Sequence, residues 1–291
     1  MEKKHHLEKE KREKIKKRRM KTQISGRVIA IGDVHSYING LKKLFEMLEE
    51  NIENFDDVWV VFLGDYVDRG PNPKETLDFL INLWENRPKT TFICGNHDLA
   101  LMTFLKLIPE PENVDFDKIV DDYKRPWQLY SGENKEKMHL QGRRYPLIYS
   151  SLPTFDGLGA EFPKQPSLSS KFSQKYRDFY INLPWIVEHP DYVFIHSGIP
   201  NDNRSWDEHI ECLRKKDLSD PRPTWICDRN HLTAPEFAQK TIVSGHVEQP
   251  EVIFKQKRIL VDTTGGENEN ISAVLLPDNK VFCVKDYKKK D

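Results

Sequence analysis

Five short apolar runs along the chain are each followed at once by side chains that could bind a metal ion or transfer a proton. These side chains belong to Asp33, His35, Asp65, Asp68, Asn96, His97, Asp98, His196 and His246. Carboxylate, imidazole and amide oxygen together suit divalent manganese, iron or zinc. If the runs are parallel strands, their carboxyl ends meet at one edge of a sheet, where ligands bind. The pattern therefore predicts one metal site built from residues that are far apart in sequence.

The residue set is large enough for two divalent ions. Two-metal hydrolases hold their ions about 3.5–4 Å apart and need a bridging carboxylate with several terminal ligands. Asp65 is the expected bridge, and Asp33 and His35 would complete the ligands of the first ion. The further ligands expected on the second ion are Asn96, His196 and His246. The predicted cofactors are two divalent metal ions, either Mn or Fe/Zn.

Each motif taken singly has an ordinary explanation. An aspartate after a strand, such as Asp33, often only caps a turn, and a lone histidine there is usually a buried side chain with one partner. Residues 64–70 are harder to explain in this way, because they place three charged residues directly after an apolar run. Burying those charges costs free energy unless a ligand compensates it. Residues 95–98 repeat the cost, so the joint pattern favours the metal site.

Strand-like and helix-like patterns alternate over the first hundred residues and would position these side chains. Apolar runs bounded by glycine predict strands buried on both faces at residues 27–31, 58–63 and 90–94. Apolar residues at helical spacing predict helices at residues 38–48 and 77–84. The order is βαβαβ, which predicts an α/β fold with a parallel sheet.

The remainder of the chain is expected to be less regular before it returns to strands. Residues 109–180 combine Pro, Ser, Gly and charged residues with weak periodicity, which predicts loops and short helices in a substrate-side insertion. Strand patterns return at residues 192–195 and recur between residues 241 and 284. We expect residues 1–25 to form a basic tail, disordered or helical, and residues 26–291 to form the catalytic domain.

Composition excludes several classes of protein. The 291 residues are 37% hydrophobic and carry a net charge of −1, which allows a sizeable core and gives no reason to expect a nucleic-acid partner. Four cysteines without a CxxC pair argue against a disulfide framework and favour a reducing compartment. No apolar run is long enough for a membrane span, and none forms the core of a secretory signal. The expected location is the cytoplasm, with nuclear import left open by the basic run at residues 14–21.

The motifs resemble the signature blocks of a known enzyme family. Asp33-x-His35, Gly64-Asp65-x-x-Asp68-Arg69-Gly70 and Gly95-Asn96-His97-Asp98 are similar to the three blocks of the phosphoprotein phosphatase (PPP) family, which are calcineurin-like metallophosphoesterases. The later blocks of that family resemble His196-Ser-Gly198, Ser244-Gly-His246 and Asp262-Thr-Thr-Gly265. The resemblance covers roughly residues 27–280 and implies a β-sandwich flanked by helices. It also implies a dinuclear metal site at one edge, with the C-terminal strands completing the second sheet.

This resemblance implies direct hydrolysis of a phosphomonoester by a hydroxide that the two metals activate. Arg69 would hold two phosphate oxygens bidentately, which a lysine could not do. Asn96 would add a hydrogen bond to the phosphate while it binds the metal. His97 would protonate the leaving oxygen, and Asp68 would orient and charge that imidazole. One departure is Ser36, which stands where the family usually has glycine.

Substrate preference is predicted from a smaller part of the chain. Residues 94–107 and Met138–Tyr145 most resemble the Rhizobiales-like subgroup of the family, which is associated with phosphotyrosine. Arg143 and Arg144 are candidates to line a slot for phosphotyrosine or to bind a second phosphate. Arg229 is a further candidate for the second phosphate-binding arginine. The expected partner is a phosphoprotein substrate, and the sequence identifies no regulatory subunit.

Three alternatives remain open at this point. The first is a phosphoserine or phosphothreonine phosphatase with the same machinery. The second is a dinucleoside polyphosphate hydrolase, a group that shares the Gly95–Leu99 run but lacks an aspartate at the place of Asp68. The third is a scaffold that has lost catalysis, which the complete ligand set and the His97 and Asp68 pair argue against. Asp68 favours a protein phosphatase over the dinucleoside polyphosphate hydrolase.

Overall fold

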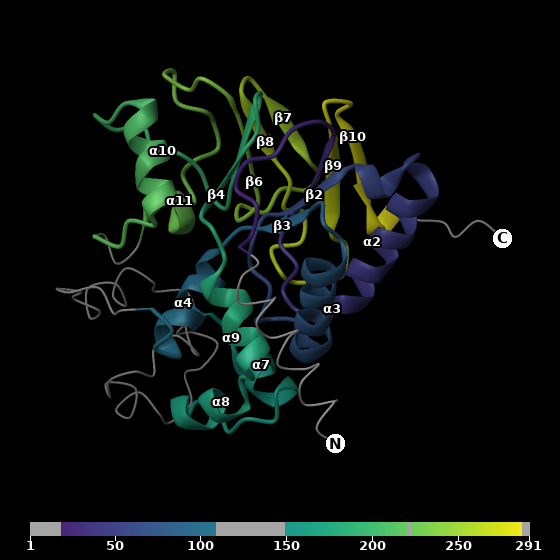
Figure 1. The fold of residues 1–291 in the computed structure, drawn as a ribbon, viewed down its shortest axis with the longest axis vertical. Coiled ribbons are helices and arrows are strands. Elements are labelled where there is room, and N and C mark those ends of the chain that lie inside the picture. Colours follow the sequence, from purple (N-terminus) through teal and green to yellow (C-terminus); the bar gives the residue numbers. More distant parts are fainter. Residues whose placement is uncertain (1–18, 109–148, 220–222, 287–291) are drawn as a thin grey trace.

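Two five-stranded sheets form the centre of the computed structural model (Figure 1). The structure describes residues 19–108, 149–219 and 223–286. One apolar cluster contains residues of both sheets, and the helices lie outside them. The predicted α/β sandwich flanked by helices is therefore confirmed.

The first sheet has the strand order β10-β9-β1-β2-β3. Strands β1, β2 and β3 pair in parallel, as the βαβαβ pattern predicts. Strand β9 pairs antiparallel with the free side of β1, and β10 pairs antiparallel with β9. The bounds of these strands are β1 Val28–Ile31, β2 Trp59–Phe62, β3 Thr90–Phe92, β9 Ser272–Leu276 and β10 Lys280–Cys283.

The second sheet has the strand order β4-β5-β6-β8-β7. Its three inner strands, β5, β6 and β8, are parallel, and antiparallel strands β4 and β7 form its edges. The bounds of these strands are β4 Ile186–Glu188, β5 Tyr192–Ile195, β6 Thr241–Ser244, β7 Ile253–Lys255 and β8 Arg258–Leu260.

The expected place of the C-terminal strands is partly wrong. Strands β6, β7 and β8 do complete the second sheet, but β9 and β10 join the first one. Strand β1 would otherwise leave one side of its backbone without partners, and the antiparallel addition of β9 satisfies those groups. Apolar patterning predicts that a segment is a strand, but it does not say which strand becomes its neighbour.

Alternating side chains of the central strands explain why those strands are apolar throughout. Val28 and Ala30 of β1 face the cluster between the two sheets. Ile29 and Ile31 belong to the other cluster, which contains the apolar faces of the outer helices. Both faces of β1 are therefore buried, so a charge at any of its positions would be buried as well.

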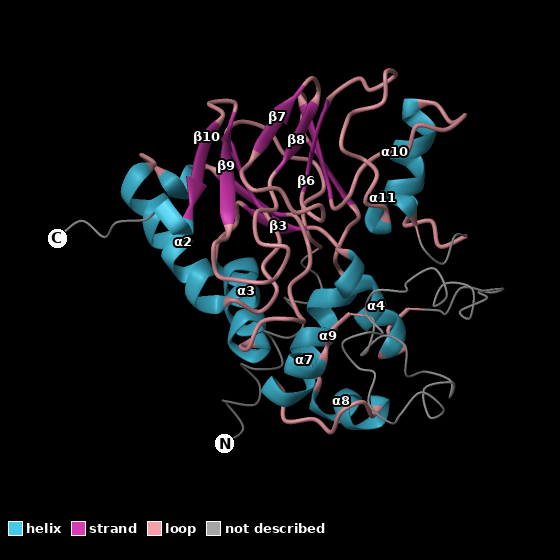
Figure 2. Cartoon of the chain, turned by 180° about the vertical axis from the view of Figure 1, so that it is seen from behind, coloured by secondary structure: helices cyan, strands magenta, loops and turns pink. Residues whose placement is uncertain are grey.

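The helices cover the outer faces and one end of the sandwich. Figure 2 shows α2 and α3 beside the first sheet and α10 and α11 on the side of the second sheet. Short helices occur in the described part of the predicted insertion, and residues 109–148 lie outside the described residues. The bounds are α2 Ile38–Asn51, η1 Phe55–Asp57, α3 Pro73–Asn86, α4 Asn96–Phe104, α7 Leu152–Gly157, α8 Gln165–Lys171, α9 Gln174–Ile181, α10 Trp206–Lys215, α11 Thr224–Cys227 and η4 Val284–Asp286.

The folded part begins earlier than the predicted boundary at residue 25. Met20 and Ile24 are buried in the two apolar clusters. Gln23 pairs with Glu188 of β4 and donates a hydrogen bond of 2.8 Å to its carboxylate. The many charges of the segment conceal these few apolar contacts in the sequence. The rest of the predicted tail, residues 1–18, lies outside the described residues.

Two predicted absences can be compared with the structure. No disulfide joins any of the four cysteines, all of which lie in the described part of the chain. Among the described helices, none combines the length and the apolar character needed to cross a membrane.

Candidate metal centre

The loops that carry the candidate ligands leave the carboxyl ends of five strands and meet at one edge of the sandwich. Asp33 and His35 follow β1, Asp65 follows β2, and His196 directly follows β5. His246 follows β6 two residues after its end. The convergence predicted from the parallel sheet is therefore present in the structure.

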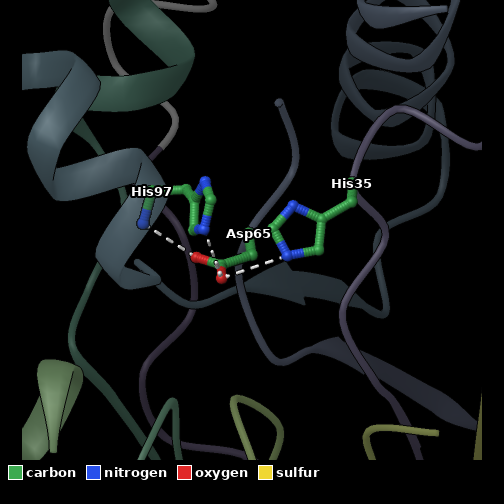
Figure 3. Close-up of side chains that lie close together, drawn as sticks. All are labelled: His35, Asp65 and His97. Atoms are coloured by element: carbon green, nitrogen blue, oxygen red, sulfur yellow. Dashed lines mark hydrogen bonds and ion pairs between the residues drawn. The ribbon is translucent and has the colours of Figure 1, made fainter. Parts of the chain in front are cut away.

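Asp65 lies at the centre of the candidate ligands. Its Oδ2 is 3.4 Å from Nε2 of His35, 3.5 Å from Nε2 of His196 and 3.9 Å from Nε2 of His97. Figure 3 shows His35, Asp65 and His97 pointing toward one another, with His35 and Asp65 on loops and His97 at the start of helix α4. Donor atoms from three separate segments thus face a single carboxylate, as a bridging ligand requires.

Asp65 itself is held by the start of α4, which follows β3. Its Oδ1 accepts a hydrogen bond of 3.0 Å from the backbone N–H of His97. Asp98 accepts hydrogen bonds of 2.7 Å from the backbone of Asp65 and 2.9 Å from that of Gly95. A side chain at Gly95 would place its Cβ 2.1 Å from Asp65 Oδ1, so only glycine fits. Asp98 is a positioning residue for which the sequence analysis named no role.

Histidine ring orientation is set by backbone carbonyls. Nδ1 of His35 lies 2.9 Å from the carbonyl of Val67, and Nδ1 of His196 lies 2.6 Å from that of Leu63. A carbonyl only accepts, so each Nδ1 must donate its proton to it. In the neutral ring, Nε2 then presents a lone pair to the site, as it does in metal-binding histidines.

His246 and Asp33 meet on the far side of this cluster. The backbone N–H of His246 donates to both carboxylate oxygens of Asp33, at 3.1 Å and 3.2 Å. Nε2 of His246 is buried and has no hydrogen-bond partner among the described residues. Its ring lies 4.9 Å from that of His196, measured between ring centres. An unpartnered nitrogen in this place fits a metal ligand.

Asn96 completes the predicted set at the start of α4. Its Oδ1 lies 2.9 Å from Nε2 of His196. With the His196 proton on Nδ1, its Nε2 and this oxygen are both acceptors, a pairing that a proton or a cation between them would stabilise. Without a cation, nearby Asp65 and Asp33 outweigh burial and raise the pKa of His196 to about 10. A divalent ion would take the place of that proton.

Buried negative charge favours cations at the same place. Burial raises the pKa of Asp33 well above its ordinary value, and the neighbouring Asp262 and Asp65 raise it further. The Asp65 carboxyl is also destabilised by burial, but His196 and His97 outweigh burial and hold its pKa well below its ordinary value. Asp262 has one carboxylate oxygen that is buried without a hydrogen-bond partner in the described chain. The donor set and its charge both fit two divalent metal ions.

Two groups of residues could hold those ions. Each group brings its ligand atoms within 4.8 Å of one another, and both contain Asp65. The first group combines Asp65 with His35 and His97, and the second combines it with His196 and His246. The bridging position expected for Asp65 is consistent with both groups.

His97 forms a buried pair with Asp68. Nδ1 of His97 lies 2.8 Å from Oδ2 of Asp68, and both side chains are almost fully buried. The other oxygen of Asp68 accepts a 2.7 Å hydrogen bond from Thr154 of α7. Burial lowers the pKa of His97, and Asp65 opposes that effect. Asp68 thus fixes the ring so that Nε2 faces the metal ligands.

Tyr149 is a further member of the site that sequence patterns did not indicate. Its ring packs edge-on against His97, with 4.6 Å between the ring centres. A side-chain hydrogen bond joins it to Asn96, and burial raises its pKa. Tyr149 belongs to the irregular segment before α7, where no periodic pattern identifies an inward-facing residue.

The predicted phosphate-binding residues are found in different places. Arg69 is half-buried and donates from Nη1 to the carbonyl of Gly265, next to the metal ligands. Arg229 is exposed and lies near His246, since its Nη2 is 3.4 Å from the His246 carbonyl. Arg143 and Arg144 lie outside the described residues.

Ser36 follows the first histidine with a φ of +62°. This left-handed backbone explains why glycine is the usual residue of the family at this position. The Ser36 hydroxyl is buried without a hydrogen-bond partner among the described residues.

Comparison with known proteins identifies related sequences and folds. A family model described as calcineurin-like phosphoesterase matches residues 26–276. A symmetrical bis(5'-nucleosyl)-tetraphosphatase of Legionella pneumophila is 42% identical over 76 residues, which are 26% of this chain and 25% of that protein. The chain therefore matches only about a quarter of the length of that relative.

Two solved protein phosphatases share the fold. A cold-active protein-tyrosine phosphatase of a psychrophilic Shewanella species superimposes with a TM-score of 0.55 and 16% identity, over 93% of this chain and 81% of that one. A protein serine/threonine phosphatase from Saccharomyces cerevisiae, with similarity to human phosphatase PP5, has a TM-score of 0.51 and 13% identity, over 97% and 89%. At these identities the similarity extends to the fold alone.

Proposed function

Because this chain belongs to the calcineurin-like phosphoesterase family, we propose that it is a phosphoprotein phosphatase that hydrolyses phosphomonoesters and prefers phosphotyrosine. The observation that carries the phosphomonoester part of the proposal is the buried pair of His97 and Asp68 beside Asp65. This pair can deliver a proton to a leaving oxygen that departs poorly as an anion.

The residues that would hold the metals are those predicted from the sequence. Asp33, His35 and the bridging Asp65 would hold one ion. Asp65 would share the second ion with Asn96, His196 and His246. When bound, two divalent ions would supply an activated water and neutralise the charge of the phosphate.

The other side chains of the site would bind the phosphate and protonate the leaving group. Arg69 carries a planar guanidinium that matches two phosphate oxygens, and the Gly265 carbonyl holds one end of it. The Asn96 amide would donate to a third oxygen. Phosphate bound beside His97 raises its pKa because opposite charge favours the imidazolium, and this opposes the effect of burial. Nε2 of His97 could then donate its proton to the leaving oxygen.

Leaving-group chemistry separates this proposal from the second candidate function, which is hydrolysis of dinucleoside tetraphosphates. A tyrosine phenol has a pKa of about 10, so its departure as an anion at neutral pH needs proton donation. A serine or threonine alcohol is still less acidic and needs it more. A nucleotide leaving group departs as a phosphate anion with a pKa of about 6 and needs no such proton. A buried proton donor held by a carboxylate therefore favours a phosphomonoester on a protein.

Hydrolysis of dinucleoside tetraphosphates remains the second candidate function. The 42% identity to the Legionella tetraphosphatase favours it. That identity extends over only 26% of this chain. The preference for tyrosine rests on Met138–Tyr145 and on Arg143 and Arg144 within it, which lie outside the described residues.

A competition between three substrates tests the proposal. The purified protein with added manganese is assayed on a phosphotyrosine peptide, the same peptide with phosphothreonine, and diadenosine tetraphosphate. We expect the highest kcat/KM on phosphotyrosine and the lowest on the dinucleotide. A higher kcat/KM on the dinucleotide would refute the phosphatase proposal. A higher value on phosphothreonine than on phosphotyrosine would refute only the tyrosine preference. Arg143→Ala, compared with Arg144→Ala, then tests whether either arginine sets that preference.

A further inference from the structure

Arg258 is a cation buried in the protein without an acidic partner. It is the first residue of β8 and has no exposed surface. No carboxylate of the described residues lies within ion-pair distance of its guanidinium, although several acidic side chains line the nearby metal centre. Burial lowers its pKa to about 9. A charge buried at this cost needs hydrogen bonds that an apolar residue could not make.

The guanidinium donates its hydrogen bonds mainly to backbone carbonyls. Nη2 donates to the carbonyl of Ser197 at 2.6 Å, to that of His231 at 3.0 Å and to the Ser244 hydroxyl at 2.8 Å. Nε donates to the His231 carbonyl as well, at 3.1 Å. Nη1 lies 3.3 Å from two further strand carbonyls. All three nitrogens of the fork therefore have acceptors.

These acceptors are next to the histidines of the second metal group. The backbone of Arg258 pairs with Ile242 of β6, and its side chain runs along β6 to the hydroxyl of Ser244. Ser244 lies two residues before His246 in the chain, and Ser197 directly follows His196. One side chain thus connects the loop after β5 with the end of β6.

We propose that Arg258 is a positioning residue of the second metal ion, which holds the backbones of His196 and His246 at a fixed separation. The two rings must present Nε2 to one ion, and a small shift of either loop separates those atoms. Arg258 can hold both loops because its five donors have a rigid planar arrangement. A lysine has a single nitrogen on a flexible stem and cannot reach acceptors on two loops and a strand together.

This inference rests on the metal centre of the proposed function but not on its protein substrate. Groups that orient metal ligands typically change metal affinity by roughly 10- to 100-fold when they are replaced. We therefore expect Arg258→Lys to weaken one of two manganese sites by that factor and to leave the other nearly unchanged. Added manganese should then restore kcat on p-nitrophenyl phosphate.

Arg87 offers a matched control. Its guanidinium is also buried and donates to backbone carbonyls, with Nη2 2.8 Å from that of Val58 and Nη1 2.6 Å from that of Lys89. These carbonyls precede β2 and β3, at the end of the sheet opposite the metal centre. Arg87→Lys should lower the melting temperature but leave manganese affinity unchanged.

The experiment is a manganese titration of the wild type, Arg258→Lys and Arg87→Lys. Equilibrium binding measures the affinity of each site, and thermal unfolding measures the stability of each protein. Loss of one site in Arg258→Lys, with both sites retained in Arg87→Lys, supports the proposal. Two unchanged sites in Arg258→Lys, or an equal loss in both variants, overturns it. If Arg258→Lys does not fold, Ser244→Ala removes one acceptor and decides the question in its place, with weaker binding at one site as the supporting result and unchanged binding as the refuting one.

The same titration separates this proposal from the proposed function. A wild-type protein that binds two manganese ions but cleaves no phosphate ester contradicts the phosphatase function, and the role of Arg258 is then judged by binding alone. A wild-type protein that binds no manganese overturns both.

Discussion

Replacing Asp68 by asparagine removes the negative charge that faces His97 and keeps the size of the side chain. Asp68 Oδ2 lies 2.8 Å from His97 Nδ1, and neither side chain has more than 2% of its surface exposed. Asp68 adopts a φ of +71°, which asparagine tolerates well, so the backbone should not change. A hydrogen bond to a charged group contributes about 1.5–3 kcal/mol. We expect this loss in the transition state, which is a factor of roughly 10 to 100 in rate.

The size of the effect should depend on the leaving group. A phosphoserine peptide releases a poorly acidic alcohol and should show the full loss in kcat/KM. p-Nitrophenyl phosphate releases an acidic phenol that needs little protonation, so its kcat/KM should change by only about twofold. Both substrates are measured on the wild type and on Asp68→Asn under saturating manganese, with thermal unfolding to check that the variant is folded.

Equal losses on the two substrates would refute the reasoning. They would mean that Asp68 acts on metal binding or on phosphate binding and not on proton transfer. Thr154→Val provides a comparison, because it removes the 2.7 Å hydrogen bond to the other oxygen of Asp68 but keeps the charge. Its effect should have the same dependence on the leaving group and a smaller size.

Further predictions concern the metals, the site and the fold. Removing metal with a chelator should abolish activity and lower the melting temperature, and readdition of manganese at a hundred times its Kd should restore about 2.7 kcal/mol; an unchanged melting temperature would count against the metal centre. Tyr149→Phe removes the hydrogen bond to Asn96 and should lower kcat/KM by about 2- to 10-fold, whereas an unchanged value would exclude a role for the hydroxyl. Burial raises the pKa of Glu188, but hydrogen bonds from Arg214 outweigh it and hold the pKa below the ordinary value of 4.5, so its stabilisation is present above pH 4.5 and is lost as the pH falls further. Glu188→Gln should therefore lower stability at pH 7 by about 1–3 kcal/mol and flatten the acid loss, which urea unfolding at several pH values would measure.

Local patterns predicted the parallel part of the first sheet and the residues that converge on its edge. Because β1, β2 and β3 pair in parallel, their carboxyl ends lie at the same edge of the sheet. Polar residues that follow these strands therefore lie close together. The same local patterns do not identify which strand becomes the neighbour of another. The run at residues 271–276 is apolar whichever sheet it joins, and only the free side of β1 decides the outcome.

Long-range hydrogen bonds account for the roles that patterns did not assign. Asp98 accepts from backbone groups of two loops, and Arg258 donates to acceptors up to 61 positions away. A charged residue at the start of a short strand resembles an exposed edge residue, yet Arg258 is completely buried. Met20 and Ile24 were hidden for the opposite reason, because the surrounding charges suggested a solvated tail. In each case the role depends on a partner that no local window contains.

The residues of the site violate local rules of backbone conformation and of charge burial. Six non-glycine residues of the site adopt a positive φ, and they are His35, Ser36, Asp65, Asp68, Arg69 and His246. Each such residue costs about 1–3 kcal/mol, so their sum is comparable to the roughly 5–15 kcal/mol that stabilises a whole domain. Buried like charges on Asp33, Asp65 and Asp262 add to that cost. Apolar contacts between two sheets can compensate the backbone strain, but they cannot compensate the charge. Divalent cations at this edge would do so, and the same ions would hold the strained loops in the geometry that hydrolysis needs.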